Sequence, residues 1–216
     1  GTVNEVVNGL LGPPGRLTAR NVPAVAVVPG GSANVFARSL GIPHDPIDAT
    51  NQLIDLLGEY RQTHTWRRIG LMDCGERWGV FTAGMGVDGE VVASVEAHRK
   101  RGRRQKGVSA TRYIRSAIPT VLRSARRAPT LTLRLPDRDP VTGVHFVFVS
   151  NSSPWTYANA RPVYTNPDCR FETGLGVFAT TSMSVWRNLG LVRRMLSKKG
   201  KVKAAHLVRD DDVAWL

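Results

Sequence analysis

The chain has 216 residues, of which 42% are hydrophobic, and this is enough apolar sequence for a globular core rather than a disordered segment. A formal net charge of +13 favours an anionic partner such as a nucleotide, a nucleic acid or a lipid headgroup. The two cysteines, Cys74 and Cys169, are too few for a disulfide framework or a zinc site. No stretch reaches the roughly 20 apolar residues that a membrane-spanning helix needs.

The first 60 residues show the pattern of an α/β unit. Apolar residues at helical spacing predict a helix over 3–11, and the β-branched run 24–28, bounded by proline and glycine, predicts a buried parallel strand. Residues 33–40 return to a helical pattern. A further helix is predicted over 45–60, because Asp45 can cap its N-terminus and a proline follows at the first helical position.

From about residue 61 the chain becomes rich in strand patterns. The predicted strands are 63–72, 78–83, 130–135, 144–150, 175–181 and 202–209, and the polar turn 73–77 predicts a hairpin between the first two. Inserted helices are predicted at 89–98, 109–125 and 184–196. We therefore expect two domains, an α/β piece at residues 1–60 and a β-rich piece at residues 61–216, with a ligand cleft between them.

Two glycine turns, each leading into a helix, are the main functional signal of the sequence. One is Gly1-Thr2 and the other is Gly30-Gly31. Glycine lets backbone N–H groups approach an anion, and a helix N-terminus adds oriented dipoles, so the pair predicts a cradle for the phosphates of a nucleotide. Because the chain starts inside the first turn, without a strand before it, we interpret it as a fragment.

Three motifs in order resemble the diacylglycerol kinase catalytic domain superfamily, which includes bacterial lipid kinases and sphingosine kinases. GTVNE (1–5) is similar to the end of the GGDGTxxE signature, PGGSANVFARSLGIP (29–43) to the family's P-x-G-T/S-x-N-x-x-A-R-x-L-G-I-P stretch, and AGMGVDGEV (83–91) to its GxGFDAxV segment. The resemblance implies an α/β fold, in which a truncated NAD kinase/diacylglycerol kinase-like nucleotide domain is followed by a β-rich, β-sandwich domain that binds the lipid.

The resemblance also implies ATP and Mg²⁺ as cofactors and assigns residues to them. The hydroxyl of Ser32 is expected to reach a phosphate, Asn34 to organise the magnesium and nucleotide, and Glu5 to match the family's acidic residue. The alternatives are that Glu5 favours its helix N-terminus and that Ser32 caps the next helix. Asp88 is expected to bind the lipid headgroup hydroxyl, with a helix N-cap as the alternative. The expected cofactor-binding residues are Gly1, Thr2, Glu5, Gly30, Gly31, Ser32 and Asn34.

No catalytic residue or metal ligand is assigned within the chain. The family's signature aspartate would lie before Gly1 and its late acidic residue after Leu216, so the chain by itself is expected to be inactive. It also departs from the family pattern at two positions. Val35 stands where many bacterial diacylglycerol kinases have aspartate, and Thr173 replaces the aspartate of an AxxxDGLLD-like segment, which argues against a second, structural metal site there.

Three further side chains have less specific expectations. Trp155 and Tyr157 are interpreted either as the lining of a lipid entrance or as an aromatic plug in a loop. Asn8 is expected to face solvent or to serve a structural role. The five histidines show no metal-ligand spacing and receive no role.

The leading hypothesis is a lipid kinase that transfers the γ-phosphate of ATP to the hydroxyl of diacylglycerol or a related lipid, giving phosphatidate or an analogous lipid phosphate. The expected partners are the lipid substrate and an anionic membrane surface, for a cytoplasmic protein held peripherally at the membrane by its basic residues. No specific nucleic acid is expected, and a homodimer is left open. The alternatives are an NAD kinase-like sugar-hydroxyl kinase and a non-enzymatic, basic lipid- or nucleic-acid-binding module.

Overall fold

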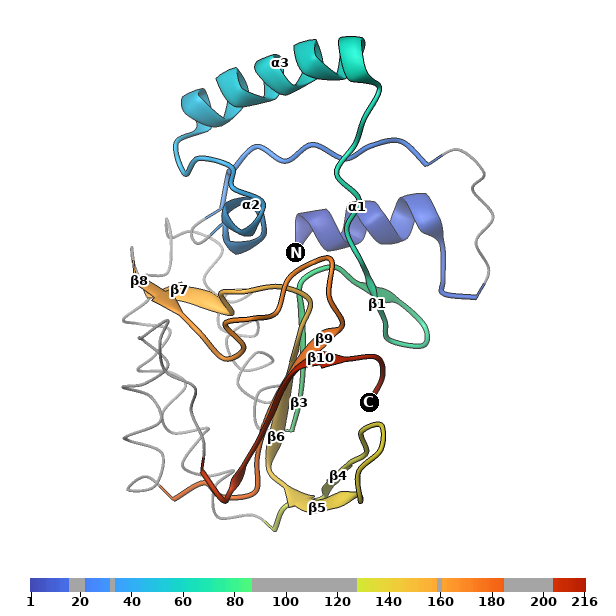
Figure 1. Ribbon diagram of the computed structural model, residues 1–216, viewed down its shortest axis with the longest axis vertical. Helices are drawn as coiled ribbons and strands as arrows, with labels where there is room; N and C mark the ends of the chain where they lie inside the picture. Colours follow the sequence, from blue (N-terminus) through green and yellow to red (C-terminus); the bar gives the residue numbers. More distant parts are fainter. Residues whose placement is uncertain (16–21, 32–33, 87–127, 159–160, 185–203) are drawn as a thin grey trace, which may run out of the picture.

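A computed structural model describes residues 1–15, 22–31, 34–86, 128–158, 161–184 and 204–216 (Figure 1). The helices in these ranges are α1 (Thr2–Leu11), α2 (Val35–Ser39) and α3 (Pro46–Thr63). The strands are β1 (Met72–Asp73), β2 (Trp78–Gly79), β3 (Thr82–Gly86), β4 (Leu131–Leu133), β5 (Val141–Val144), β6 (Phe146–Ser150), β7 (Thr156–Ala158), β8 (Arg161–Val163), β9 (Leu175–Thr180) and β10 (Leu207–Val213). The predicted helices 89–98 and 109–125, and most of 184–196, lie outside the described residues.

The three helices confirm the sequence-based expectations, and their ends follow from local chemistry. The carboxylate of Asp45 accepts hydrogen bonds from the N–H groups of Ile47 (2.8 Å) and Asp48 (3.2 Å), which starts α3 where the capping pattern predicts. This helix ends when His64 takes a left-handed conformation with φ of 52°. α1 ends at Gly12, whose φ of 70° a glycine adopts without strain.

The predicted parallel strand at 24–28 is wrong. These residues are assigned to neither strand nor helix, and none of the described strands pairs with them. Val25 and Val28 remain 42% and 45% exposed. A strand requires a partner for its backbone N–H and C=O groups, and an apolar run alone does not supply one.

A four-stranded antiparallel sheet in the order β10-β9-β6-β3 forms the centre of the molecule. β6 lies between β3 and β9, so that Ser150 pairs with Thr82 on one side and with Gly176 on the other. The predicted strands 144–150 and 175–181 are confirmed in β6 and β9. The last strand is shifted from the predicted 202–209 to Leu207–Val213, and of the predicted strand 63–72 only residue 72 is in a strand.

The two faces of this sheet bury different kinds of side chain. One face packs against the hairpin β4–β5 and carries the main core, which comprises Met72, Leu133, Leu135, Val144, Val147, Val149, Val177, Ala179 and Val213. The other face carries the rings of Phe146, Phe148 and Phe178, together with Leu207. Because strand residues alternate between faces, β6 contributes valines to the first face and phenylalanines to the second.

Two short hairpins complete the described structure. β1 and β2 form the hairpin predicted around the polar turn 73–77, although each strand has only two residues. β7 and β8 pair antiparallel at a place where no strand is predicted, since three-residue strands that include Pro162 give no periodic signal. The chain is thus a mixed α/β structure with several sheets, and the β-sandwich arrangement stays a prediction.

The helices lie beyond one end of the central sheet, and α3 is set apart from the sheet (Figure 1). Ala49 is the only residue of α3 that is buried, whereas Ile47 and Ile54 are 72% and 61% exposed. α1 and α2 lie closer to the sheet end, where β2 and β3 begin. Among the described helices, none combines the length and the apolar character needed to cross a bilayer.

Candidate functional site

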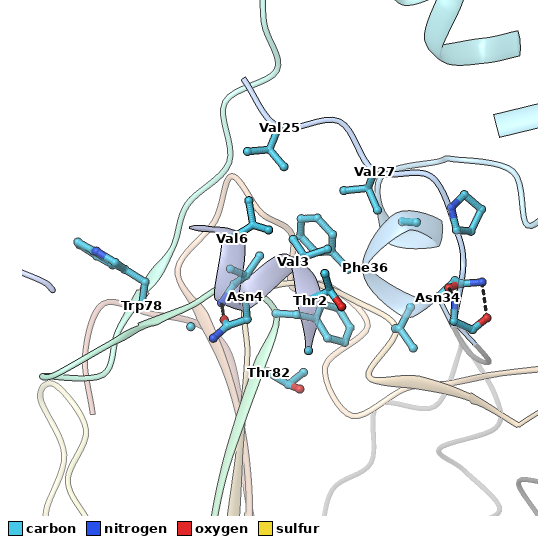
Figure 2. Close-up of a pocket in the computed structure, with 18 of the residues that line it drawn as sticks. Thr2, Val3, Asn4, Val6, Val25, Val27, Asn34, Phe36, Trp78 and Thr82 are labelled. Carbon is cyan, nitrogen blue, oxygen red and sulfur yellow. Dashed lines mark hydrogen bonds between the residues drawn. The ribbon is translucent and has the colours of Figure 1, made fainter. Parts of the chain in front are cut away.

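A cleft of about 1020 Å³ opens between the helices and the edge of the β-rich region (Figure 2). Its walls come from four segments: the first turns of α1, the extended segment 25–31, α2 with the preceding Asn34, and Cys74 with the chain from Arg77 to Ala83. Figure 2 shows Val3 and Val6 of α1 facing the segment that carries Val25 and Val27. Segments distant in the sequence therefore meet at one site.

Most of the predicted cofactor-binding residues lie around this cleft. Gly1 and Thr2 line it from the N-terminus of α1, and Gly30, Gly31 and Asn34 line it from the second turn. The two glycine turns are thus brought together, as the sequence predicts, although their role in binding stays a prediction.

The other three predicted site residues are not among the described residues that line the cleft. Glu5 is not among the lining residues. Ser32 and Asp88 lie outside the described residues, so their expected contacts with a phosphate and with a lipid hydroxyl stay predictions.

Asn34 holds the second glycine turn closed through two hydrogen bonds. Its Oδ1 accepts from the N–H of Gly31 at 2.7 Å, and its Nδ2 donates to the carbonyl oxygen of Gly31 at 2.8 Å. Asn34 has a left-handed backbone with φ of 48°, a conformation that asparagine tolerates better than most residues. The side chain therefore fixes the shape of the turn that enters α2, and the magnesium and nucleotide contact that the resemblance implies stays a prediction.

Two asparagines attach α1 to the strands on the other side of the cleft. Asn8 donates from Nδ2 to the carbonyl oxygen of Trp78 (2.9 Å) and accepts at Oδ1 from the Trp78 N–H (2.8 Å). The Oδ1 of Asn4 accepts from the N–H of Val80 at 3.1 Å. The structural interpretation of Asn8 is therefore confirmed. No role is predicted for Asn4 from the sequence. Its spacing of four residues from Asn8 places both side chains on one helix face, which is the signal that could have indicated it.

Arg77 provides the only charged side chain among the described cleft-lining residues. Its Nη2 forms an ion pair with Oε2 of Glu5 at 2.8 Å, and both side chains are more than half exposed. Glu5 also lies in the first turn of α1, where a negative charge is favoured by the helix dipole. Among the described residues, Glu5 is thus the partner of Arg77 in an ion pair next to the cleft.

α2 is held from the β-rich region by two aromatic side chains. The ring of Phe36 meets the ring of Phe171 edge-on, with centroids 5.5 Å apart. The guanidinium carbon of Arg38 lies 3.3 Å from the centre of the Tyr157 ring. Tyr157 belongs to β7 rather than to a loop, and whether it lines a lipid entrance or acts as a plug stays a prediction. Trp155 instead stacks on Phe148 with centroids 4.8 Å apart.

Asn151 connects the strand end behind the cleft with the chain that enters it. This residue is 2% exposed, and its Nδ2 donates to the carbonyl oxygens of Gly70 (2.6 Å) and Val80 (3.0 Å). Its backbone N–H donates to the carbonyl oxygen of Phe81 at 2.8 Å. Val80 and Phe81 both line the cleft, so one buried amide fixes this part of its wall.

Comparison with known proteins identifies the N-terminal part of the chain. The model of the diacylglycerol kinase catalytic domain matches residues 1–65, which include both glycine turns and all three described helices. Residues 1–65 belong to the diacylglycerol kinase catalytic domain family. The resemblance predicted from the first two motifs is confirmed, while the third motif at 83–91 lies beyond the match.

Two curated relatives carry lipid kinase names. A Chromohalobacter salexigens protein named "Probable lipid kinase YegS-like" is 32% identical over 101 residues, which cover 47% of this chain and 29% of that protein. A Bacillus subtilis protein named "Diacylglycerol kinase" is 49% identical over 47 residues, which cover 22% of this chain and 14% of that protein. The matched part of the chain spans less than a third of either relative.

The fold is shared with a solved structure. A crystal structure of a "putative diacylglycerol kinase" from Bacillus anthracis aligns with a TM-score of 0.55 and 18% sequence identity, over 96% of this chain and 58% of that one. The mixed α/β fold is therefore that of a diacylglycerol kinase-like structure, of which this chain spans 58% of the length.

The region around Thr173, where the sequence departs from the family pattern, forms a tight turn. The hydroxyl of Thr173 donates to the carbonyl oxygen of Arg170 at 2.9 Å, and the N–H of Gly174 donates to Oδ1 of Asp212 at 2.6 Å. Within the described ranges, no three His, Cys, Asp or Glu side chains gather closely enough to hold a metal ion.

The two cysteines have different surroundings. Cys74 is exposed and lines the cleft, whereas Cys169 is buried. Burial raises the pKa of the Cys169 thiol to about 11, because the thiolate would lose its solvation there. The pKa of Cys74 is also raised, mainly by partial burial and then by the charge of Asp73.

Proposed function

We propose that this chain is part of a lipid kinase that uses ATP as the phosphate donor and diacylglycerol or a related lipid alcohol as the acceptor. In this reaction the lipid hydroxyl oxygen forms a bond to the γ-phosphorus, and the bond between that phosphorus and the oxygen shared with the β-phosphate breaks. The hydroxyl proton passes to a base, and ADP leaves. The products are ADP and a lipid phosphate such as phosphatidate.

The observation that carries this proposal is the meeting of the two glycine turns at one cleft. Gly1-Thr2 at the start of α1 and Gly30-Gly31 before α2 come from segments separated by the whole of α1, yet both line the same space. Glycine backbone and a helix N-terminus favour a phosphate group. Both turns lie within residues 1–65, which belong to the diacylglycerol kinase catalytic domain family.

The polar groups around the cleft have distinct roles in this proposal. The N-terminus of α1 contributes unpaired N–H groups and the positive end of its dipole to the phosphates. Asn34 keeps the Gly30-Gly31 turn in one shape, so that this turn needs no reorganisation when a nucleotide binds. Arg77 adds a positive charge near the opposite wall.

The described residues do not fit a magnesium site. Among the described residues that line the cleft, none is a carboxylate, and Glu5 is paired with Arg77. Magnesium is normally bound by carboxylates and by the phosphates of the substrate. Magnesium, when bound, would neutralise the transferring phosphate, but no described residue is assigned as its ligand and no step is derived through it.

The proposed division of labour follows the two parts of the chain. Residues 1–60 would belong to the nucleotide domain and residues 61–216 to the part that holds the lipid. The net charge of +13 supports docking on an anionic membrane surface, where each basic residue near the surface contributes about 1 kcal/mol. We therefore propose a cytoplasmic enzyme that associates with the membrane from one side.

The test is transfer of labelled phosphate from ATP by the whole protein, offered diacylglycerol, sphingosine, ceramide and NAD in parallel. A labelled lipid is the expected product, and its identity would give the substrate class. Label on NAD would favour the sugar-hydroxyl kinase instead. The absence of any labelled product, combined with retention on DNA that weakens steeply with salt, would favour a non-enzymatic basic module and contradict the proposal.

A further inference from the structure

α2 is a wall of the cleft that its own backbone hardly stabilises. The helix has five residues, and an isolated helix of that length does not form in water because nucleation is costly. Asn34 through Ala37 nevertheless line the cleft. The position of this wall must therefore be set by contacts with other parts of the chain.

The first of these contacts is made by Phe171. Its ring lies 5.5 Å from the ring of Phe36, and Phe171 is only 2% exposed. Its backbone is fixed as well, because the N–H of Gly70 donates to its carbonyl oxygen at 2.9 Å. An ion pair between Arg67 and the neighbouring Glu172 at 2.9 Å joins the same two segments. Phe171 is thus a firm support for α2.

The second contact is made by Tyr157 and is both shorter and electrostatic. The guanidinium carbon of Arg38 lies over the ring at 3.3 Å from its centre, well within the range of cation–π attraction. Tyr157 is held in the β7–β8 hairpin, where it pairs with Pro162. The N–H of Arg38 donates to the carbonyl oxygen of Asn34 at 3.0 Å, so the backbone of Arg38 connects directly to the residue that shapes the glycine turn.

We propose that Tyr157 and Phe171 are positioning residues for the phosphate cleft: they hold α2 against the β-rich region and thereby keep Asn34 and the Gly30-Gly31 turn in place. This inference rests on the proposed function for its effect on nucleotide binding. Its structural part, the position of α2, is independent of any ligand.

The structural part is tested by amide hydrogen exchange in the whole protein without nucleotide. Tyr157→Leu removes the aromatic face and is expected to speed exchange about fivefold at the amides of Arg38, Leu40 and Ile42, which donate to the carbonyl oxygens of Asn34 and of α2 residues. Tyr157→Phe keeps the ring and is expected to leave that exchange unchanged. The matched control is Trp66→Leu, which removes an aromatic ring that stacks on Tyr60 with centroids 3.6 Å apart, away from the cleft.

The functional part is tested by a double-mutant cycle on ATP affinity. Arg38→Met and Tyr157→Leu are each expected to raise the dissociation constant for ATP about fivefold. The double variant is expected to be no weaker than either single variant, because both remove the same contact. Tyr157→Phe is expected to keep the affinity of the wild type, because it retains the ring on which the Arg38 guanidinium lies.

The outcomes separate this inference from the proposed function. Unchanged α2 exchange in Tyr157→Leu would overturn the inference, whatever ATP does. If exchange is faster in Tyr157→Leu but the wild-type protein binds no ATP, the result would support the holding of α2 and contradict the kinase proposal. Accelerated exchange with unaltered ATP affinity, or with additive effects in the cycle, would overturn the positioning role of Tyr157.

Discussion

The N-terminal helical region and the central sheet differ in how their sequence patterns are used. In the sheet, β6 buries Val147, Val149 and Ser150, and β9 buries five consecutive residues, among them Val177 and Phe178, which are no more than 1% exposed. In the helical region the apolar pattern is equally regular, but Ile47 and Ile54 of α3 stay more than 60% exposed. Most of the buried core of the described chain therefore lies in the sheet, whereas the glycine turns of the cleft lie in the helical region.

The difference teaches how the cleft is held together. The helices that line the cleft bury few of their own side chains, and specific polar and aromatic contacts attach them to the β-rich region. Asn8 bonds to the backbone of β2, and Arg38 lies over the ring of Tyr157. Loss of one such contact should therefore alter the cleft, whereas loss of an exposed apolar side chain of α3 should not.

The largest expected effect is on the sheet core. Phe178→Ala should lower the free energy of unfolding by about 3–5 kcal/mol, because it leaves a cavity at a site that is 1% exposed. Ile54→Ala, at a residue that is 61% exposed, should change it by less than about 0.5 kcal/mol. Urea unfolding of both variants measures the contrast. A similar decrease in the free energy of unfolding in the two variants would show that Ile54 is packed, and this would contradict the difference between the two regions.

The next effect concerns the attachment of α1. Asn8→Ala removes the side chain that bonds to both the N–H and the carbonyl oxygen of Trp78. The free energy of unfolding should fall by about 1–3 kcal/mol, because these partly buried groups lose their hydrogen bonds. Thermal unfolding would measure the change. Asn51→Ala on exposed α3 is the matched control and should be close to neutral. A neutral Asn8→Ala would indicate that solvent replaces these bonds.

A smaller effect is expected for the charge at the cleft. Arg77→Gln should raise the dissociation constant for ATP about fivefold, since the half-exposed guanidinium lines the cleft and attracts phosphate. Arg61→Gln, on α3 away from the lining residues, should leave ATP binding unchanged. Equal changes in the two variants would mean that only the overall positive charge matters.

The smallest effect distinguishes the two thiols. At pH 8 a thiol reagent should modify Cys74 in the folded protein and leave Cys169 unmodified, because burial raises the Cys169 pKa to about 11. Denaturant should expose both. An acid with a raised folded pKa weakens folding at high pH, so stability should fall between pH 9 and 11, and less so in Cys169→Ala. Modification of Cys169 in the folded protein would contradict its burial.

The sequence predicts the local elements of the helical region well. Capping by Asp45 gives the start of α3, and two glycine turns followed by helices indicate the cleft that Gly1 and Gly30 line. Such features depend on residues that are neighbours in the sequence, and they can therefore be predicted from it. The same local information predicts a strand at 24–28, and it fails there because pairing depends on a partner strand.

The parts of the site that the sequence misses depend on distant contacts. The role of Asn4 depends on the hydrogen bond from the N–H of Val80, which is 76 residues away in the sequence. The residues next to Tyr157 in the sequence do not indicate that its ring lies under Arg38. These interactions join segments far apart in the chain, and periodicity and capping carry no information about such pairs.

The central claim, that the two glycine turns form a nucleotide-phosphate site, is tested most directly by calorimetric titration of ATP into the whole protein and into Gly31→Val. A side chain at position 31 would meet Oδ1 of Asn34 at 3.1 Å and displace the turn, while Gly58→Val on α3 has open space and serves as control. The account predicts that the wild type and Gly58→Val bind ATP, and that Gly31→Val binds at least about tenfold more weakly. Equal affinity in all three proteins, or no binding by the wild type, would contradict it.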